Sequence, residues 1–144
     1  MIKQLVVAAL LLVGVSAYAV DEISDANIQA KVFQSKGIVF VDVYAPWCSY
    51  CKKMAPMVER AEKEFAGKIT FYKLDSDKNE QTRAAYSITG LPTALVFLDG
   101  KLGLAIPGAP KDYPEFENAM NQLVEAAAAY EASKQASPSP SPAQ

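Results

Sequence analysis

The only two cysteines of the 144-residue chain, Cys48 and Cys51, are separated by two residues in the stretch APWCSYCKKMAP. This spacing suits three kinds of chemistry: a reactive redox pair, two ligands of a metal ion, or a structural disulfide. Cys48 is expected where a strand ends and a helix begins, so that unpaired backbone N–H groups and the helix dipole favour its thiolate. Cys51 follows one turn later and is expected to be more covered. The pattern therefore predicts that Cys48 attacks a substrate disulfide and that Cys51 resolves the mixed disulfide.

Two charged residues interrupt apolar runs that are expected to form neighbouring strands. Asp42 lies in the run IVFVDVY, which leads to the cysteines, and Lys73 lies at the centre of TFYKLD. A carboxyl group buried beside the cysteines has a raised pKa, so it can take and return the proton of Cys51. The alternative is that Asp42 and Lys73 only pair with each other or face solvent at strand ends.

Trp47 and Pro92 are two further candidates for the site. Trp47 is the only tryptophan and directly precedes Cys48. Its ring either belongs to a surface that meets the substrate, where amphipathic aromatic rings are favoured, or fills the core. Pro92, in the stretch TGLPT at the mouth of a strand, is a candidate cis proline, although few X–Pro bonds are cis.

The elements that position these residues follow from hydrophobic periodicity and turn signals. Strands are expected at 38–44, 69–75, 93–98 and 101–106, the last two joined by the hairpin signal Asp99-Gly100. Helices are expected at 24–34, begun by a Ser24 or Asp25 cap, at 51–67 with a kink at Pro56, at 79–87 and at 113–133. This order implies a mixed sheet with helices on both faces.

The two ends of the chain differ in composition from this central part. Residues 1–19 read as a cleaved signal peptide, because a lysine precedes an apolar run and AYA offers small residues for cleavage. The alternative, a membrane anchor, needs about 20 apolar residues, more than this run contains. The domain is therefore expected at 20–133, in an exported compartment, which is the periplasm or, as the alternative, the medium into which the protein is secreted. The Pro/Ser segment 134–144 is expected to be a disordered tail.

Composition argues against several other functions. The chain has no histidine, which excludes Ser/His/Asp and Cys/His catalysis and every zinc site that uses histidine. Its formal net charge of -2 is spread over residues of both signs, so no nucleic-acid surface is expected. Two thiolates can hold a soft ion such as Cu(I), but a structural zinc site needs four ligands. We expect no metal and no cofactor.

Several stretches taken together resemble the thioredoxin superfamily over residues 23–128. They are VDVYAPWCSYC, YKLD, GLPT, FLDGK and, after them, Gly108. The resemblance implies an α/β, thioredoxin-like three-layer fold with a mixed four- or five-stranded sheet and helices on both faces. The family's first strand is expected to be short or missing here, because little chain lies between Val20 and the first helix.

The same resemblance implies roles for individual residues. Cys48 is then the nucleophile and Cys51 the resolving thiol, with Asp42 as the buried acid and Lys73 as its partner. Pro92 is then cis and, with the backbone of Leu91, lines a groove where an extended peptide could pair edge-on.

The pair between the cysteines, Ser49-Tyr50, departs from the family patterns, since it is neither Gly-Pro nor a pair containing histidine. Without such a charge to stabilise the thiolate, we expect a reducing pair. The sequence thus predicts a monomeric thiol–disulfide oxidoreductase that acts on protein disulfides and is kept reduced by a membrane-bound electron donor. The alternative is a non-catalytic binding module in which the disulfide is only structural.

Overall fold

The computed structural model describes residues 19–136. The signal peptide predicted at 1–19 lies outside this range apart from Ala19, and so does the predicted tail apart from residues 134–136. None of the helices within 19–136 is long and apolar enough to cross a membrane.

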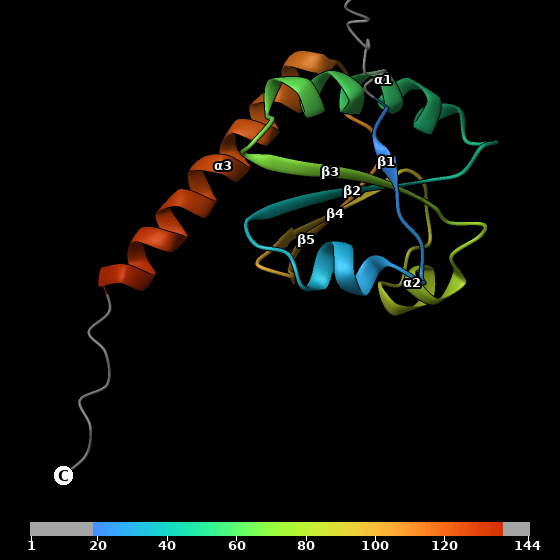
Figure 1. Ribbon diagram of the computed structural model, residues 1–144. Coiled ribbons are helices and arrows are strands. Elements are labelled where there is room, and N and C mark those ends of the chain that lie inside the picture. Colours follow the sequence, from blue (N-terminus) through green and yellow to red (C-terminus); the bar gives the residue numbers. More distant parts are fainter. Residues whose placement is uncertain (1–18, 137–144) are drawn as a thin grey trace, which may run out of the picture.

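A five-stranded mixed sheet forms the centre of the molecule, in the order β1-β3-β2-β4-β5 (Figure 1). Strands β1 and β2 run parallel to β3, whereas β4 is antiparallel to β2 and β5 to β4. The five strands are β1 (Asp21–Glu22), β2 (Ile38–Tyr44), β3 (Ile69–Asp75), β4 (Thr93–Leu98) and β5 (Lys101–Pro107). The predicted fold class is confirmed, and the first strand is short, with two residues.

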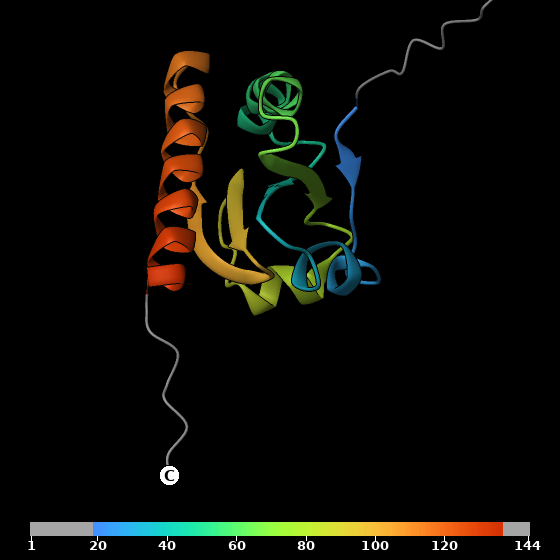
Figure 2. The ribbon, with the colours of Figure 1, turned by 60° about the vertical axis from the view of Figure 1, so that its left-hand side comes forward.

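Helices cover both faces of this sheet, which gives three layers (Figures 1 and 2). Two long helices, α1 (Ser49–Glu64) and α3 (Tyr113–Ala136), lie on one face. The short π-helix η1 (Gln29–Phe33) lies on the other face, with α2 (Glu80–Ala85) on the same side.

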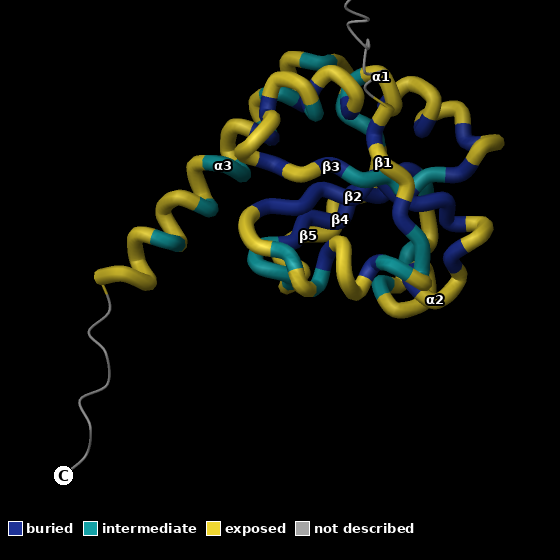
Figure 3. Tube along the Cα trace, in the orientation of Figure 1, coloured by how far each residue is buried: buried dark blue, intermediate teal, exposed yellow. Residues whose placement is uncertain are grey.

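The core consists of two apolar clusters, one on each face of the sheet. Because successive strand residues point to opposite faces, Phe40 of β2 packs toward α1 and α3, whereas Val39 and Val41 pack toward η1. The first six residues of β2 are buried, as Figure 3 shows for the centre of the sheet. This strand is therefore covered on both sides, and it ends just before the cysteines.

The predicted helices differ from the structure in their bounds. Helix α1 covers Ser49–Glu64 instead of the expected 51–67, because it begins directly after its cap Cys48, and α2 covers Glu80–Ala85 instead of 79–87.

The helix expected at 24–34 is reduced to turns followed by η1, and Asp25 caps a different helix. Its carboxylate accepts hydrogen bonds from the N–H groups of Gln81 and Thr82, in the first turn of α2. Those groups have no partner within their own helix, so an acid from a neighbouring segment satisfies them.

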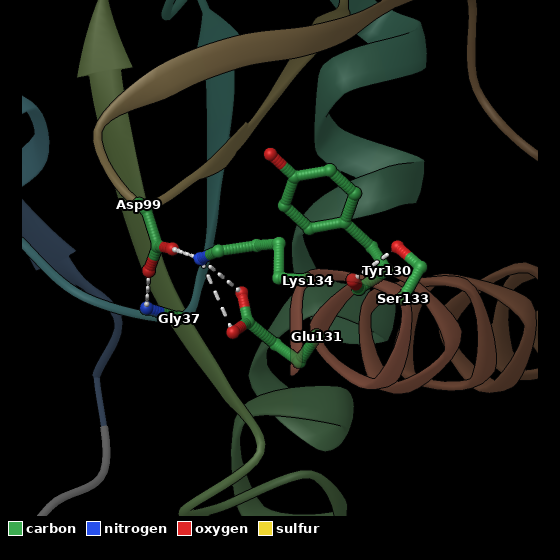
Figure 4. Close-up of polar contacts among 6 residues, drawn as sticks. All are labelled: Gly37, Asp99, Tyr130, Glu131, Ser133 and Lys134. Atoms are coloured by element: carbon green, nitrogen blue, oxygen red, sulfur yellow. Dashed lines mark hydrogen bonds and ion pairs between the residues drawn. The ribbon is translucent and has the colours of Figure 1, made fainter. Parts of the chain in front are cut away.

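The last helix continues to Ala136, so residues 134–136 belong to α3. Contacts to the sheet hold this end (Figure 4). The Lys134 ammonium lies 3.6 Å from Asp99 and 3.1 Å from Glu131, and Asp99 also accepts the N–H of Gly37 at 2.9 Å. The end of α3 is thereby tied to the hairpin between β4 and β5.

Candidate active site

Cys48 is the residue at which helix α1 begins. It takes the N-cap position with an extended backbone, and its sulfur accepts the N–H of Cys51 at 3.2 Å. A disulfide joins the two residues, whose Cα atoms are 5.3 Å apart. The sulfur of Cys48 therefore lies at the end of the helix where unpaired N–H groups and the helix dipole stabilise an anion.

The expected difference in exposure between the two cysteines is not found. Cys48 is 5% exposed and Cys51 is 3% exposed. Both pack with Ala45, and the side chains of Tyr44 and Leu91 lie against this cluster. The two sulfurs thus differ in hydrogen bonding and in position on the helix, not in burial.

Asp42 is a buried carboxyl group next to this cluster. It is 4% exposed, and burial raises its pKa to about 7, although the charge of Lys73 acts in the opposite direction. Within residues 19–136 its Oδ1 has no hydrogen-bond partner. The alternative in which Asp42 faces solvent is therefore wrong.

A pocket of about 190 Å³ lies between Asp42 and Cys51. Asp42, Cys51 and Lys73 all line it. Asp42 and Lys73 are cross-strand neighbours on β2 and β3, but in the described part of the chain no ion pair joins them. A pocket of this size and polarity has room for water, which offers a path for a proton between the carboxyl group and the sulfur.

Trp47 lies on the surface beside the disulfide, so its ring does not fill the core. It is 70% exposed, and its indole Nε1 donates a 2.8 Å hydrogen bond to Asp77. Sequence reasoning did not identify Asp77 as a site residue. The only local signal was the acidic stretch LDSD after a strand, where Asp75 accepts the N–H of Asp77 and shapes the turn.

The Leu91–Pro92 peptide bond is cis, as predicted. Pro92 is buried, and its carbonyl accepts the N–H of Gly108 at 2.9 Å. Leu91 packs against the cluster that contains both cysteines. The segment before β4 thus lies next to the disulfide, although the two lie far apart in the sequence.

A family model described as Thioredoxin matches residues 19–125. The chain belongs to the thioredoxin family. It is 34% identical over 94 residues to Thioredoxin from Synechocystis sp., an alignment covering 65% of this chain and 88% of that protein.

Longer relatives of this thioredoxin-family chain match it over part of their length. Thioredoxin M4, chloroplastic, from Arabidopsis thaliana is 38% identical over 94 residues, covering 65% of this chain and 49% of the relative. Protein disulfide-isomerase A3 from Gallus gallus is 35% identical over 97 residues, covering 67% of this chain and 19% of the relative. The chain therefore spans about half of the plant relative and a fifth of the isomerase.

The two residues between the cysteines form part of the exposed surface around the disulfide of this thioredoxin-family site. Ser49 and Tyr50 are both exposed, Tyr50 by 62%. The Lys53 ammonium lies 5.5 Å from the centre of the Tyr50 ring, within the range of a cation–π contact. Together with Trp47, Tyr50 places a second large aromatic side chain on the surface next to the disulfide.

Proposed function

We propose that this protein is a thiol–disulfide oxidoreductase that exchanges its Cys48–Cys51 pair with disulfides of protein substrates. The observation that carries the proposal is the position of the Cys48 sulfur, which caps α1 and accepts the N–H of Cys51. A hydrogen bond from N–H to sulfur stabilises a thiolate, which is both the nucleophile and the better leaving group.

The exchange consists of two displacements at sulfur. The Cys48 thiolate attacks one sulfur of a substrate disulfide, which forms a mixed disulfide and releases the other substrate sulfur as a thiolate. The Cys51 thiolate then attacks the Cys48 sulfur, which forms the Cys48–Cys51 disulfide and releases the second substrate sulfur. The substrate gains two electrons and two protons, and the protein loses them.

Asp42 serves the second displacement in this proposal. Cys51 must lose its proton before it attacks, and Asp42 lines the same pocket. A carboxyl group with a pKa of about 7 can accept and return a proton near neutral pH, which suits a general base.

Trp47, Leu91 and Pro92 are proposed to form the surface that binds the substrate. Trp47 is exposed beside the disulfide, and Leu91 contacts the cysteine cluster. Neither the N–H nor the C=O of Leu91 has a backbone hydrogen-bond partner within the described residues. An extended substrate segment can pair with these two groups and so place its disulfide beside Cys48.

The reducing direction, the compartment and the electron donor are further parts of the proposal. No histidine or other cation separates the two cysteines, so the thiolate lacks the stabilisation that makes a disulfide strongly oxidising. The N-terminal segment supports export, with the periplasm preferred. In an oxidising compartment a reducing pair needs a supply of electrons, for which we propose a membrane-bound donor.

Reduction of insulin by dithiothreitol, followed by turbidity, tests the activity. The wild type is expected to accelerate the reaction, whereas Cys48→Ser has no effect and Cys51→Ser accumulates a mixed disulfide with insulin. If the wild type and Cys48→Ser are equally inactive, the disulfide is structural and the protein is a binding module.

Equilibration with glutathione tests the direction. We expect a reduction potential well below the ~-120 mV of strongly oxidising disulfide enzymes. A value near that figure would overturn the reducing direction but not the exchange activity. Fractionation of the native cell and N-terminal sequencing of the mature chain test export, with a start near Val20 expected.

A further inference from the structure

Three charged residues of alternating sign lie side by side across the sheet next to the disulfide. Lys73 of β3 is the cross-strand neighbour of Asp42 on β2 and of Glu22 on β1. Residues that face each other on adjacent strands point to the same face of a sheet. In the register of the sheet, Lys73 therefore lies between two acidic residues, of which Asp42 is buried and Glu22 is exposed.

Tyr44 contacts two members of this row, Glu22 and Lys73. It follows Asp42 by two residues on β2, so its side chain is on the same face. Its hydroxyl donates a hydrogen bond to Glu22 at 3.3 Å, and the centre of its ring is 6.0 Å from the Lys73 ammonium. Burial and the charge of Glu22 raise the pKa of Tyr44 to about 12, so the hydroxyl keeps its proton as a donor.

Lys73 has no ion-pair partner within residues 19–136. Its charge is therefore available to both carboxylates, and its position is defined by the row and by the Tyr44 ring. A change at Glu22 alters the electrostatic energy of the Asp42 carboxylate in two ways, because this energy depends on charge and distance. It removes a negative charge, and it removes a group that attracts the Lys73 side chain.

We propose that Glu22 is a positioning residue for thiol–disulfide exchange, because it shares Lys73 with Asp42 and so sets the pH at which Asp42 exchanges a proton with Cys51. The inference rests on the proposed function and extends it to the edge strand β1. Glu22 does not line the pocket, so it acts on Asp42 through Lys73 and Tyr44, which do.

Other titratable or charged groups also face Asp42. Cys51 and Lys52 of α1 line the same pocket, as does Tyr44, and Asp75 of β3 is the cross-strand neighbour of Tyr44. Lys78 lies 3.7 Å from Asp75 and offsets part of its charge. Of these groups, Tyr44 contacts Glu22 directly, so a difference between wild type and variant reports on Glu22 together with its hydrogen bond to Tyr44.

Carboxyl-carbon NMR of the oxidised full chain measures the pH midpoint at which the Asp42 carboxyl group titrates. No thiol titrates in the oxidised state, so this midpoint is not mixed with that of a cysteine. Glu22→Gln removes one negative charge near Asp42 and leaves Lys73 with a single acidic neighbour. Both changes stabilise the carboxylate form of Asp42. We expect the midpoint to fall by about 0.3 at low salt and the difference to disappear near 1 M salt. The pH profile of insulin reduction by the variant is expected to move in the same direction.

Asp21→Asn is the matched control, since it removes the same charge from the same strand but its cross-strand neighbour is Tyr72. It is expected to shift the Asp42 midpoint less than Glu22→Gln does. Equal shifts in both variants, or none in Glu22→Gln, would overturn the inference. These outcomes are independent of enzyme activity, so a failure of the proposed function in the insulin assay is recognised separately.

Discussion

The indole nitrogen of Trp47 donates a 2.8 Å hydrogen bond to the carboxylate of Asp77. This contact holds an otherwise exposed ring in one orientation beside the disulfide. A large aromatic side chain that is already ordered loses little conformational freedom when a substrate binds. If Trp47 binds the substrate as proposed, we therefore expect Asp77 to contribute to binding through Trp47.

Replacement of Asp77 by alanine tests this relationship. Asp77→Ala removes the acceptor, so we expect the KM for insulin to rise about 2- to 10-fold, the equivalent of one hydrogen bond, with kcat nearly unchanged. The intrinsic fluorescence of Trp47 is expected to change as well. Asp77→Asn keeps an acceptor oxygen and is the control. An unchanged KM in Asp77→Ala would show that the orientation of Trp47 does not matter for binding.

The buried carboxyl group of Asp42 predicts a pH dependence of stability. Its pKa is raised from 3.8 to about 7 in the folded protein, so the folded state holds this proton more tightly than the unfolded state. This proton therefore contributes to the free energy of unfolding. The contribution is fully present below about pH 4 and is lost as the pH rises through about 7. Asp42→Asn removes this dependence, so the variant is expected to be the more stable one at pH 8, by on the order of 3–4 kcal/mol.

Urea unfolding of the oxidised wild type and of Asp42→Asn at pH 4, 6 and 8 measures this difference. The control is Asp21→Asn, which removes an exposed carboxylate and is expected to follow the wild type at all three values. Parallel pH curves for the wild type and Asp42→Asn would show that the carboxyl group is not destabilised by burial.

Replacement of Asp25 is expected to lower the stability of the fold without lowering the rate of disulfide exchange. Asn79, at the N-cap of α2, makes no side-chain hydrogen bond to its own helix, and Asp25 accepts the N–H groups of Gln81 and Thr82 instead. Asp25→Ala is expected to cost about 1–2 kcal/mol of unfolding free energy, the usual effect of losing a cap. The rate of insulin reduction at 25 °C is expected to stay within twofold of the wild type.

Thermal unfolding and the insulin assay on the same preparation check both parts of this prediction. Asp25→Asn keeps one acceptor oxygen and is expected to lie between the wild type and Asp25→Ala. A large drop in activity with unchanged stability would mean that Asp25 acts on the site and not on α2.

Much of the sheet and the position of Cys48 at the start of α1 could be predicted because the signals are local. Residues 38–44 and 69–75 are runs of β-branched and aromatic side chains, and both predicted ranges agree with β2 and β3. The hairpin at Asp99-Gly100 is confirmed, since both residues have the positive φ values that such a two-residue turn requires, 49° and 77°.

The relationships that escaped prediction depend on contacts between distant segments. The sequence around Asp25 indicates a cap for the helix that follows it, because no nearby residue signals its hydrogen bonds to the distant helix α2. The burial of Cys48 comes partly from Leu91, which is distant in the sequence and is brought nearby by the pairing of β4 with β2. The row that contains Glu22 exists because β1 pairs with β3, and a two-residue strand has too little periodicity to be recognised.

Gly100 gives the most direct test of the hairpin geometry. Its φ is +77°, and a Cβ added there would overlap the backbone carbonyl of Phe33, which cannot move aside as a flexible side chain would. Gly100→Ala is therefore expected to combine the cost of a left-handed alanine with a steric clash, more than about 2 kcal/mol in total. Gly67→Ala is the matched control, because Gly67 has a φ of +78° but no neighbour within 4 Å. It is expected to lose only about 1 kcal/mol. Equal losses in urea unfolding would show that η1 does not pack against the turn between β4 and β5.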